Sequence, residues 1–440
     1  MSEQDGRQAT AIQRPTTNDP GAWKAYWEAQ GQEWRTEPEI SIERQKYLAE
    51  RRSITPDIKQ GIYPFKDIKL NRADAEWLLA THESKGIRGP VDGSQRGLAA
   101  RIGLDLRGAD LQFVDLTRLP LAKTQGGLSG EEWVRATEEQ REMATVHLEG
   151  TNLRAAHLEG CSLSYAHLEG ARLHEAHLEG ADLYRSHLEG KLLSQTDQGW
   201  TQMVKGNSYT KLPTTDIAEA FFDAETKLDR ITMCDEKHVG IRLGGAHWGG
   251  VDVTAVEWKS IKMLRDEYEA RQLRYQNGKA KPKGRRLLEY QRATQANRQL
   301  AAVLQSQGLN EEADLFAYRG QLLQRTVWRL QRRPLKLLLS WFLYLLAGYG
   351  YRPLRSLIAY LIIIFGFMGL YLLNAHFDTP PLRWDEALVL SISSFHGRGF
   401  FTQNMTLGDT YARLAAIEAI VGLFIEISFI ATFTQRFFGK

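Results

Sequence analysis

A short polar run lies between two long apolar segments near the end of the chain. It follows an apolar stretch that starts at Trp384, and it consists of Ser393, Ser394, Phe395, His396, Gly397, Arg398 and Gly399. In channel filters, backbone carbonyls and hydroxyls of such loops replace the water shell of an ion. These residue types at this spacing could therefore coordinate a passing ion.

Two carboxylates and a glycine recur four residues apart in the second apolar segment, as Glu418, Gly422 and Glu426. This spacing places them on one face of a helix. A carboxylate at membrane depth is costly unless it pairs or faces water. Glu418 is expected near the depth of Arg398, where the two form either a structural ion pair or part of a pore, and both alternatives stay open. Glu426 is expected to line an inner aqueous cavity.

Both apolar segments, residues 354–373 and 411–434, are long enough to cross about 30 Å of hydrocarbon. Arginine and lysine crowd before the first segment and follow the second, whereas few lie between them, so both chain ends are expected in the cytoplasm. The first twenty residues lack the apolar core of a signal peptide. The apolar stretch at 335–346 is too short to span and is expected to lie along the inner leaflet. These patterns predict a multi-pass protein of the plasma (inner) membrane.

The order of these elements is a span, a short apolar helix, a Gly-x-Gly loop and a second span. It resembles a divergent member of the potassium-channel-like pore superfamily over roughly residues 354–434. The resemblance implies a pore on the axis of a homotetramer and places residues 395–399 on the family's Thr-Val-Gly-Tyr-Gly filter. Phe, His and Arg stand where that filter has Thr, Val and Tyr, which argues against potassium selectivity. A ring of Arg398 would draw anions and a ring of Glu426 would draw cations, so the sign of the permeant ion stays open.

A ten-residue unit is repeated five times in the middle of the chain. His147-Leu148-Glu149-Gly150 returns at 157, 167, 177 and 187, and a Leu falls on every fifth position from 148 to 193. A mostly small residue stands two positions before each of these leucines. A period of five fits neither a helix nor a plain strand. It predicts a square coil in which five residues form each side, with the Leu and the small residue inside.

These units resemble the pentapeptide-repeat family, whose pattern is roughly Ala-(Asp/Asn)-Leu-x-x. Residues 181–185 (ADLYR) and 109–113 (ADLQF) match it outright. The resemblance implies a right-handed quadrilateral β-helix with four units in each coil. Residues 147, 167 and 187 would then stack in one histidine column and residues 157 and 177 in another, at about 4.8 Å per coil. Imidazoles beside glutamate columns have the ligand types for zinc, but the expectation is an outward-facing ladder and no metal site.

The chain is expected to form four parts. Residues 1–98 are disordered and then helical, and residues 99–258 form the β-helix with insertions near 122–145 and 196–240. Residues 259–333 form an α-helical cytoplasmic linker or hairpin, and residues 334–440 form the α-helical two-span membrane domain with its pore helix.

Local signals mark several ends of these elements. Asn71, with Asp74 three residues later, and Ser129 are predicted helix caps. Trp248 and Trp258 stand at the centres of repeat units, and they predict an aromatic coil that caps the β-helix.

Charge and cysteine content limit the possible functions. The net charge of +3 gives no reason to expect nucleic acid as a partner, and two cysteines make no disulfide framework. No Ser-His-Asp, Cys-His or phosphate-loop pattern is present, so no enzymatic activity and no cofactor are expected.

The leading hypothesis is therefore an oligomeric, homotetrameric, ion-channel-like membrane protein with a cytoplasmic repeat domain. That domain would act in gating, as a spacer, or as a docking module for a cytoplasmic protein partner. The expected partners are the lipid bilayer, further copies of the chain and a permeant ion. The alternative is a membrane-tethered pentapeptide-repeat scaffold without conductance.

Overall fold

The structure, a computed structural model, describes residues 13–94, 101–190, 212–275, 278–351, 353–375, 382–397 and 410–437. The chain divides into two compact units, Met1–Ala313 and Asp314–Lys440. The division falls inside α8 (Asn310–Leu330), earlier than the boundary expected at residue 334. Helix α8 lies within the segment 259–333 that was expected to be helical.

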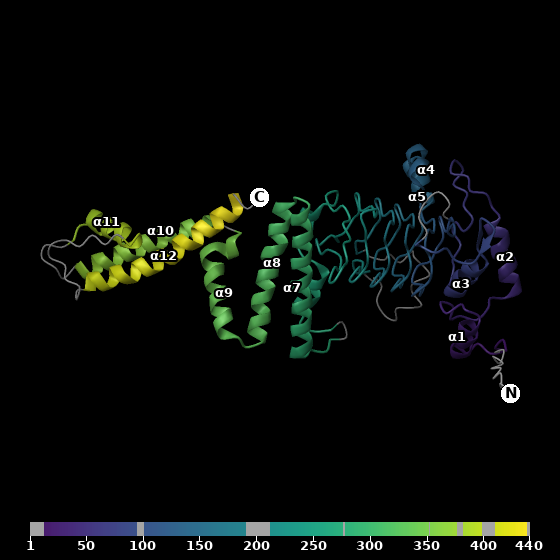
Figure 1. Ribbon diagram of the computed structural model, residues 1–440, viewed down its shortest axis with the longest axis horizontal. Helices are drawn as coiled ribbons and strands as arrows, with labels where there is room; N and C mark the ends of the chain where they lie inside the picture. The colour runs from purple at the N-terminus through teal and green to yellow at the C-terminus, as the bar shows by residue number, and fades with distance from the viewer. Residues whose placement is uncertain are drawn as a thin grey trace, which may run out of the picture. The chain divides into compact units, whose positions relative to one another are not determined.

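The centre of the first unit is a stack of short square coils (Figure 1). Parallel bridges join His147 to His167, His157 to His177, and Ser162 to Asp182, so each coil takes twenty residues. Rings stack along this register, with the centroids of His147 and His167 5.0 Å apart. These bridges confirm the coil length predicted from the period of five.

The inside of the coils is filled as the repeat predicts. The leucines at every fifth position from 148 to 188 are at most 4% exposed, and the small residues beside them are equally buried. Each buried leucine contributes about 2 kcal/mol through the hydrophobic effect. Leu193, the last predicted member of the series, lies outside the described residues.

Each side of a coil ends in a residue with a left-handed backbone. Gly150 and Gly170 have φ of +67° and +73°, and Tyr165 and Arg185 occupy the same conformation in alternate units. This conformation costs a residue with a side chain about 1–2 kcal/mol. At Gly150 a Cβ would also lie 2.4 Å from the Phe113 ring. The glycine of the repeated unit therefore relieves strain at the corners and leaves room for the neighbouring coil.

The first insertion forms two short helices, α4 (Gly130–Arg135) and α5 (Glu138–Met143). Ser129 is the N-cap of α4, as predicted, and its backbone N–H donates to Glu132 (2.9 Å). The coils on either side remain in register, because Asp110 bridges His147 across the insertion. The insertion therefore leaves the stack intact.

The second insertion, predicted at 196–240, is shorter than expected. Asp216 bridges Arg172 on one side and Arg242 on the other, so a further coil lies between them. The bridge after Phe221 falls at Lys227 rather than at residue 226. This one extra residue shifts the phase and hides the period of five in the sequence.

The N-terminal helices belong to the same unit as the coils. They are α1 (Pro20–Ala29), α2 (Ile42–Arg52) and α3 (Arg72–Thr81), and a short antiparallel pair follows, β1 (Glu83–Ser84) and β2 (Ile87–Arg88). Asn71 and Asp74 form the predicted capping box of α3. Lys69 bridges Asp110, so the segment before α3 extends the stack by one edge.

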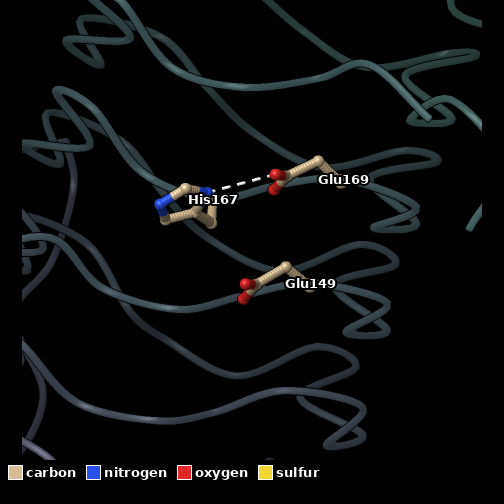
Figure 2. Close-up of side chains that lie close together, drawn as sticks. All are labelled: Glu149, His167 and Glu169. Atoms are coloured by element: carbon tan, nitrogen blue, oxygen red, sulfur yellow. Dashed lines mark hydrogen bonds and ion pairs between the residues drawn. The ribbon is translucent and has the colours of Figure 1, made fainter. Parts of the chain in front are cut away.

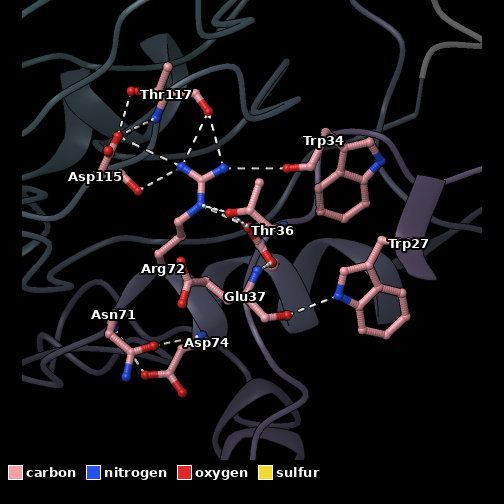
Figure 3. Close-up of polar contacts among 10 residues, drawn as sticks. Trp27, Trp34, Thr36, Glu37, Asn71, Arg72, Asp74, Asp115 and Thr117 are labelled. Atoms are coloured by element: carbon pink, nitrogen blue, oxygen red, sulfur yellow. Dashed lines mark hydrogen bonds and ion pairs between the residues drawn. The ribbon is translucent and has the colours of Figure 1, made fainter. Parts of the chain in front are cut away.

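Arg72 holds α3 against the coils (Figure 3). Its guanidinium donates to the backbone carbonyls of Asp115 (3.0 Å) and Thr117 (3.3 Å), and its Nε donates to Glu76 (2.8 Å). The buried Glu76 carboxylate also accepts from the backbone N–H of Thr36 (2.9 Å). Burial raises the pKa of Glu76, although these donors act against the shift. The helices thus cover the first edge of the β-helix, which would otherwise be open to pairing.

The other end of the coils is covered by η1 (Trp258–Ser260), α6 (Arg265–Arg271) and α7 (Lys283–Ser306). Trp248 and Trp258 are buried edge to face, which confirms the predicted aromatic cap. Gln299 accepts a hydrogen bond from the N–H of Gly245 (3.2 Å). Gln307, just after α7, accepts from the N–H of Val253 (2.8 Å). Helix α7 therefore satisfies backbone groups of the last coil, a role that its sequence did not reveal.

The second unit is helical. After α8 come α9 (Pro334–Ala347), η2 (Gly348–Gly350), α10 (Pro353–Ala375), α11 (Trp384–Phe395) and α12 (Thr410–Phe437). The short apolar helix expected at 335–346 is α9. Among the described residues, Leu354–Ala375 of α10 is the one helical stretch long and apolar enough to cross a bilayer. Helix α12 has 28 residues and is apolar apart from a few charged residues that include Glu418 and Glu426, and the second predicted span stays a prediction.

Candidate functional site

The short helix α11 lies against both α10 and α12. Near its start, Ala387 and Leu390 pack with Tyr371 of α10, and at its end Phe395 packs with Ile364 and Ile425. Asp385 and Glu386 occupy its first turn, where negative charge complements the helix dipole. The half-helix predicted between the two apolar segments is therefore present and packed on both of them.

Gly422 sets how closely α12 approaches α11. A Cβ at this position would lie 2.2 Å from the carbonyl oxygen of Phe395. No side chain larger than hydrogen fits at that distance without moving one of the helices. Within the chain, Gly422 therefore has a packing role, whereas the sequence placed it on a pore-lining face.

The predicted filter residues fall into three groups. Ser394 and Phe395 are buried, Ser393 is half-buried, and His396 and Gly397 are exposed just beyond the helix. Phe395 is the last residue of α11 and lies in an apolar cluster, where a large aromatic ring is most stable. This position differs from the sequence alignment, which placed Phe395 in the filter loop. Arg398 and Gly399 lie outside the described residues.

Glu418 is fully buried where α10, α11 and α12 meet. Its Oε2 accepts a hydrogen bond from the hydroxyl of Tyr371 (2.8 Å), and its Oε1 contacts the hydroxyl of Ser391. The same Ser391 hydroxyl lies 2.9 Å from the carbonyl of Ile364. One carboxyl group thus connects all three helices. The expected pairing of Glu418 with Arg398 falls outside the described residues, and Tyr371 and Ser391 take that place.

Sequence reasoning missed Tyr371 and Ser391 as partners. Each is a hydroxyl residue inside a mostly apolar stretch that also contains other hydroxyl residues. Buried hydroxyls normally find a hydrogen-bond partner, so these two could have been matched with the buried carboxylate of the other apolar segment.

Glu426 occupies a different environment from Glu418, although the two lie on one helix. Its carboxylate contacts the Nδ1 of His396, and both side chains are partly exposed. The Nε2 of His396 lies 3.5 Å from the Tyr360 hydroxyl. The end of α11 therefore carries a polar group of a histidine, a carboxylate and a phenol beside the middle of α12.

A second candidate site lies on the β-helix, where each His of the repeated unit contacts the Glu two residues later. In one column the Nδ1–Oε1 distances are 3.3 Å for His147–Glu149, 3.1 Å for His167–Glu169 and 3.1 Å for His187–Glu189. Figure 2 shows the carboxylates of Glu149 and Glu169 on the same side of two neighbouring coils as the imidazole of His167.

The carboxylates of this column do not face outward as expected. Glu149 and Glu169 are 5% and 3% exposed, whereas the imidazoles of His147 and His167 remain more open. The reason is that each carboxylate turns back toward its own histidine, and coils one strand spacing apart leave little room for water. The outward-facing ladder predicted from the sequence is therefore wrong for these glutamates.

The charges of neighbouring glutamates and histidines in the ladder strongly affect one another. Ligand atoms of Glu149, His167 and Glu169 all lie within 4.8 Å of one another. At that separation and an effective dielectric of 20, two ionised carboxylates repel by about 3 kcal/mol. Burial alone would raise the pKa of Glu149, but the hydrogen bond and charge of His147 lower it overall. In the opposite column, the hydrogen bond to Glu159 raises the pKa of His157.

Cys161 occupies one of the inward positions of the repeat. Burial raises the pKa of its thiol to about 12, and its Sγ lies 3.0 Å from the carbonyl of Leu121. The group stays a thiol at neutral pH, because the thiolate is the form that burial disfavours. Its role is therefore packing.

Comparison with known proteins agrees with the coil geometry. The family model described as pentapeptide repeats matches residues 151–190 in eight copies. Among curated proteins, no relative matches the chain.

Several solved structures of repeat proteins are similar to part of the chain. HetL, a pentapeptide repeat protein of the cyanobacterium Nostoc involved in heterocyst differentiation regulation, is 25% identical, with a TM-score of 0.16. That match covers 34% of this chain and 49% of HetL, about half its length. A pentapeptide repeat protein from the Arabidopsis thaliana thylakoid lumen is 18% identical over 40% of this chain and 84% of its own, with a TM-score of 0.14. QnrB1, a plasmid-mediated fluoroquinolone resistance protein, is 14% identical over 35% of this chain and 65% of its own, with a TM-score of 0.13.

These TM-scores are too low to support a fold assignment. The assignment depends instead on the twenty-residue spacing of the parallel bridges and on the family match. Coils of twenty residues, leucines inside at every fifth position and eight matching units agree with one another. Together they identify residues 151–190 as pentapeptide repeats within a β-helix of the first unit.

Proposed function

We propose that this protein is a homotetrameric, ion-channel-like membrane protein whose pentapeptide-repeat β-helix is a cytoplasmic gating, spacer or docking module. The observation that carries the proposal is the position of α11. This helix of 12 residues ends beside the middle of α12, and Gly422 allows the close approach. A half-helix between two longer helices is the arrangement that builds a constriction when copies meet on an axis.

The surfaces of α10 and α12 support insertion in a bilayer. Large apolar side chains on both helices are mostly exposed, far more than a water-facing surface tolerates. Those that point outward include Leu354, Ile362, Phe365 and Leu373 on α10, and Ile420, Leu423, Ile427 and Ile430 on α12. The two carboxylates of α12 have partners within the chain, which lowers the cost of placing α12 in the membrane as the second span.

The polar group at the end of α11 is the proposed constriction. Glu426 and His396 are its acidic and basic members, and the carbonyls at the end of the helix add partial negative charge beside them. Four copies on one axis would concentrate these groups in the path of an ion. The flux assay therefore compares cations and anions in the same preparation.

The test is ion flux in liposomes that contain the purified full-length protein. We expect flux from an oligomer of four chains, and we expect Glu426→Gln to change its rate or ion selectivity several-fold. Asp385→Asn is the matched control, because it removes a carboxylate from the opposite, exposed end of α11. A detergent-stable monomer, or vesicles that stay tight to every ion under voltage and tension, would overturn the proposal.

One observation favours the second candidate, a membrane-tethered scaffold without conductance. The carboxyl group of Glu418 finds its partners on α10 and α11 of the same chain, so the three helices can close without further copies. In this case the membrane unit anchors the β-helix, which binds a cytoplasmic protein. Cross-linking in native membranes separates the two, because the scaffold remains monomeric and the channel yields a tetramer.

A further inference from the structure

We propose that Glu149, His167 and Glu169 form a binding site for one divalent transition-metal ion of the zinc class. The sequence predicted no metal site at the histidine ladder. The structure brings an imidazole nitrogen and two carboxylates from neighbouring coils together, with all three candidate ligand atoms within 4.8 Å of one another (Figure 2).

The ligand types and spacing suit zinc. Zinc binds imidazole nitrogen and carboxylate oxygen at about 2.0–2.2 Å, which places the ligand atoms of a tetrahedral site about 3.3 Å apart. The Nδ1 of His167 and Oε1 of Glu169 are already 3.1 Å apart. The ligand atom of Glu149 lies within 4.8 Å of those of His167 and Glu169. One imidazole in the set favours zinc over magnesium or calcium, which prefer oxygen ligands alone.

Glu149 provides an independent observation. Its side chain is 6% exposed, and its Oε1 contacts His147. Its Oε2 is buried and has no hydrogen-bond partner among the described residues. A buried carboxylate oxygen is normally satisfied by a donor or a cation, and a metal ion would meet that need. His147 would then act as the outer partner that orients the ligand.

A cavity beside His167 has room for water and for an approaching ion. His167 lines a cavity of about 280 Å³ together with Glu138 and Glu142 of α5. Water in this cavity could complete a fourth coordination position. Arg185, which pairs with Glu138, and Arg230 also line the cavity and offset the charge of its two acids. The imidazole nitrogen of His167 that binds the metal must carry no proton, as is usual for such ligands.

The opposite face of the β-helix has a second cluster with the same ligand types, but its carboxylates are more exposed to solvent. Glu159, His177 and Glu179 also bring their ligand atoms within 4.8 Å. Their carboxylate side chains are 19% and 28% exposed, against 6% and 3% for Glu149 and Glu169. Water competes better for the exposed carboxylates, so this cluster is expected to bind more weakly. It supplies a control histidine, His177, that matches His167.

The experiment is calorimetric titration of the chelator-treated full-length protein with zinc chloride and, separately, magnesium chloride. We expect one high-affinity zinc site per chain and no comparable magnesium site. His167→Ala should weaken that site at least tenfold, and the isosteric Glu149→Gln should weaken it several-fold. His177→Ala should leave it unchanged. X-ray absorption of the zinc complex should show one imidazole among oxygen ligands.

Three results would overturn the proposal. They are the absence of a saturable zinc site in the parent protein, retention of full affinity in His167→Ala, and an equal loss in His177→Ala. Circular dichroism of the metal-free variants checks folding. If His167→Ala fails to fold, the zinc affinity of Glu149→Gln decides the question, because this substitution conserves the side-chain volume. Undiminished zinc affinity in Glu149→Gln would count against the site.

Discussion

The clearest perturbation of the second unit is Glu418→Gln. The hydroxyl of Ser391 has one proton, yet it lies within hydrogen-bond distance of two acceptors, the carbonyl of Ile364 and the carboxyl of Glu418. Two separate two-centre hydrogen bonds form when Glu418 carries a proton and donates it to Ser391, while Ser391 donates to Ile364. Tyr371 donates to the remaining oxygen of Glu418. The geometry therefore fits a neutral acid at this position, and no ion pair to Glu418 is formed among the described residues.

A glutamine reproduces this pattern. Its amide can donate to Ser391, and its oxygen can accept from Tyr371, with almost the same volume. We expect Glu418→Gln to change the free energy of unfolding by less than about 0.5 kcal/mol, because every hydrogen bond is retained. Tyr371→Phe removes one bond to the acid and should cost about 1–2 kcal/mol. Glu418→Leu leaves two buried hydroxyls without their partner and should cost at least as much as Tyr371→Phe.

The assay is denaturant titration of the full-length protein in mild detergent, with the helical signal of each variant compared with the parent. A protonated carboxyl also has its own infrared carbonyl band, which Glu418→Gln should remove at neutral pH. If Glu418 were ionised, replacing it would change stability by several kcal/mol, since a buried charge without a cation is strongly destabilising. A change above about 2 kcal/mol in either direction, with no carboxyl band lost, would refute the reasoning.

Three further predictions concern single sites. Burial raises the pKa of Asp266 to about 6, so the folded state still holds a proton that the unfolded state releases near pH 4. The resulting stabilisation of about 3 kcal/mol is lost as the pH rises through 6. Urea titrations should show that Asp266→Asn gains stability relative to the parent between pH 4 and 7.5. Gly422→Ala puts a Cβ 2.2 Å from a carbonyl of α11 and should cost about 1–3 kcal/mol in detergent, whereas Gly366→Ala on α10, with nothing within 4 Å, should be nearly neutral. Leu168→Ala opens a cavity inside a coil and should lower the free energy of unfolding by about 2–5 kcal/mol, while Arg172→Ala on the outside of the same coil should change it by no more than about 0.5 kcal/mol.

Much of the fold could be predicted from local patterns. The leucines at every fifth position gave the coil length, because a residue that must lie inside recurs once per side of the square. Asn71 and Ser129 were correctly identified as helix caps, since a cap contacts backbone groups only two or three residues away. The short helix α11 was also expected, from an apolar stretch with acids in its first turn.

The candidate site was predicted less completely. His396 and Glu426 were selected as separate residues, but their contact spans thirty positions of sequence. Tyr371 was not selected at all, although it donates to Glu418 from another helix. Such pairs depend on the angle and depth at which helices pack, and a single sequence contains no direct measure of either.

By itself, the sequence determined the elements whose cause lies within a few neighbouring residues: the five-residue side of the coil, the capped helix starts and the apolar helices of the second unit. The tertiary structure alone decided that Glu149 and Glu169 lie buried, that α7 covers the last coil, and that Glu418 joins three helices. The physical reason is range. Periodicity and capping act between adjacent residues, whereas burial and side-chain pairing depend on which distant segments exclude water together.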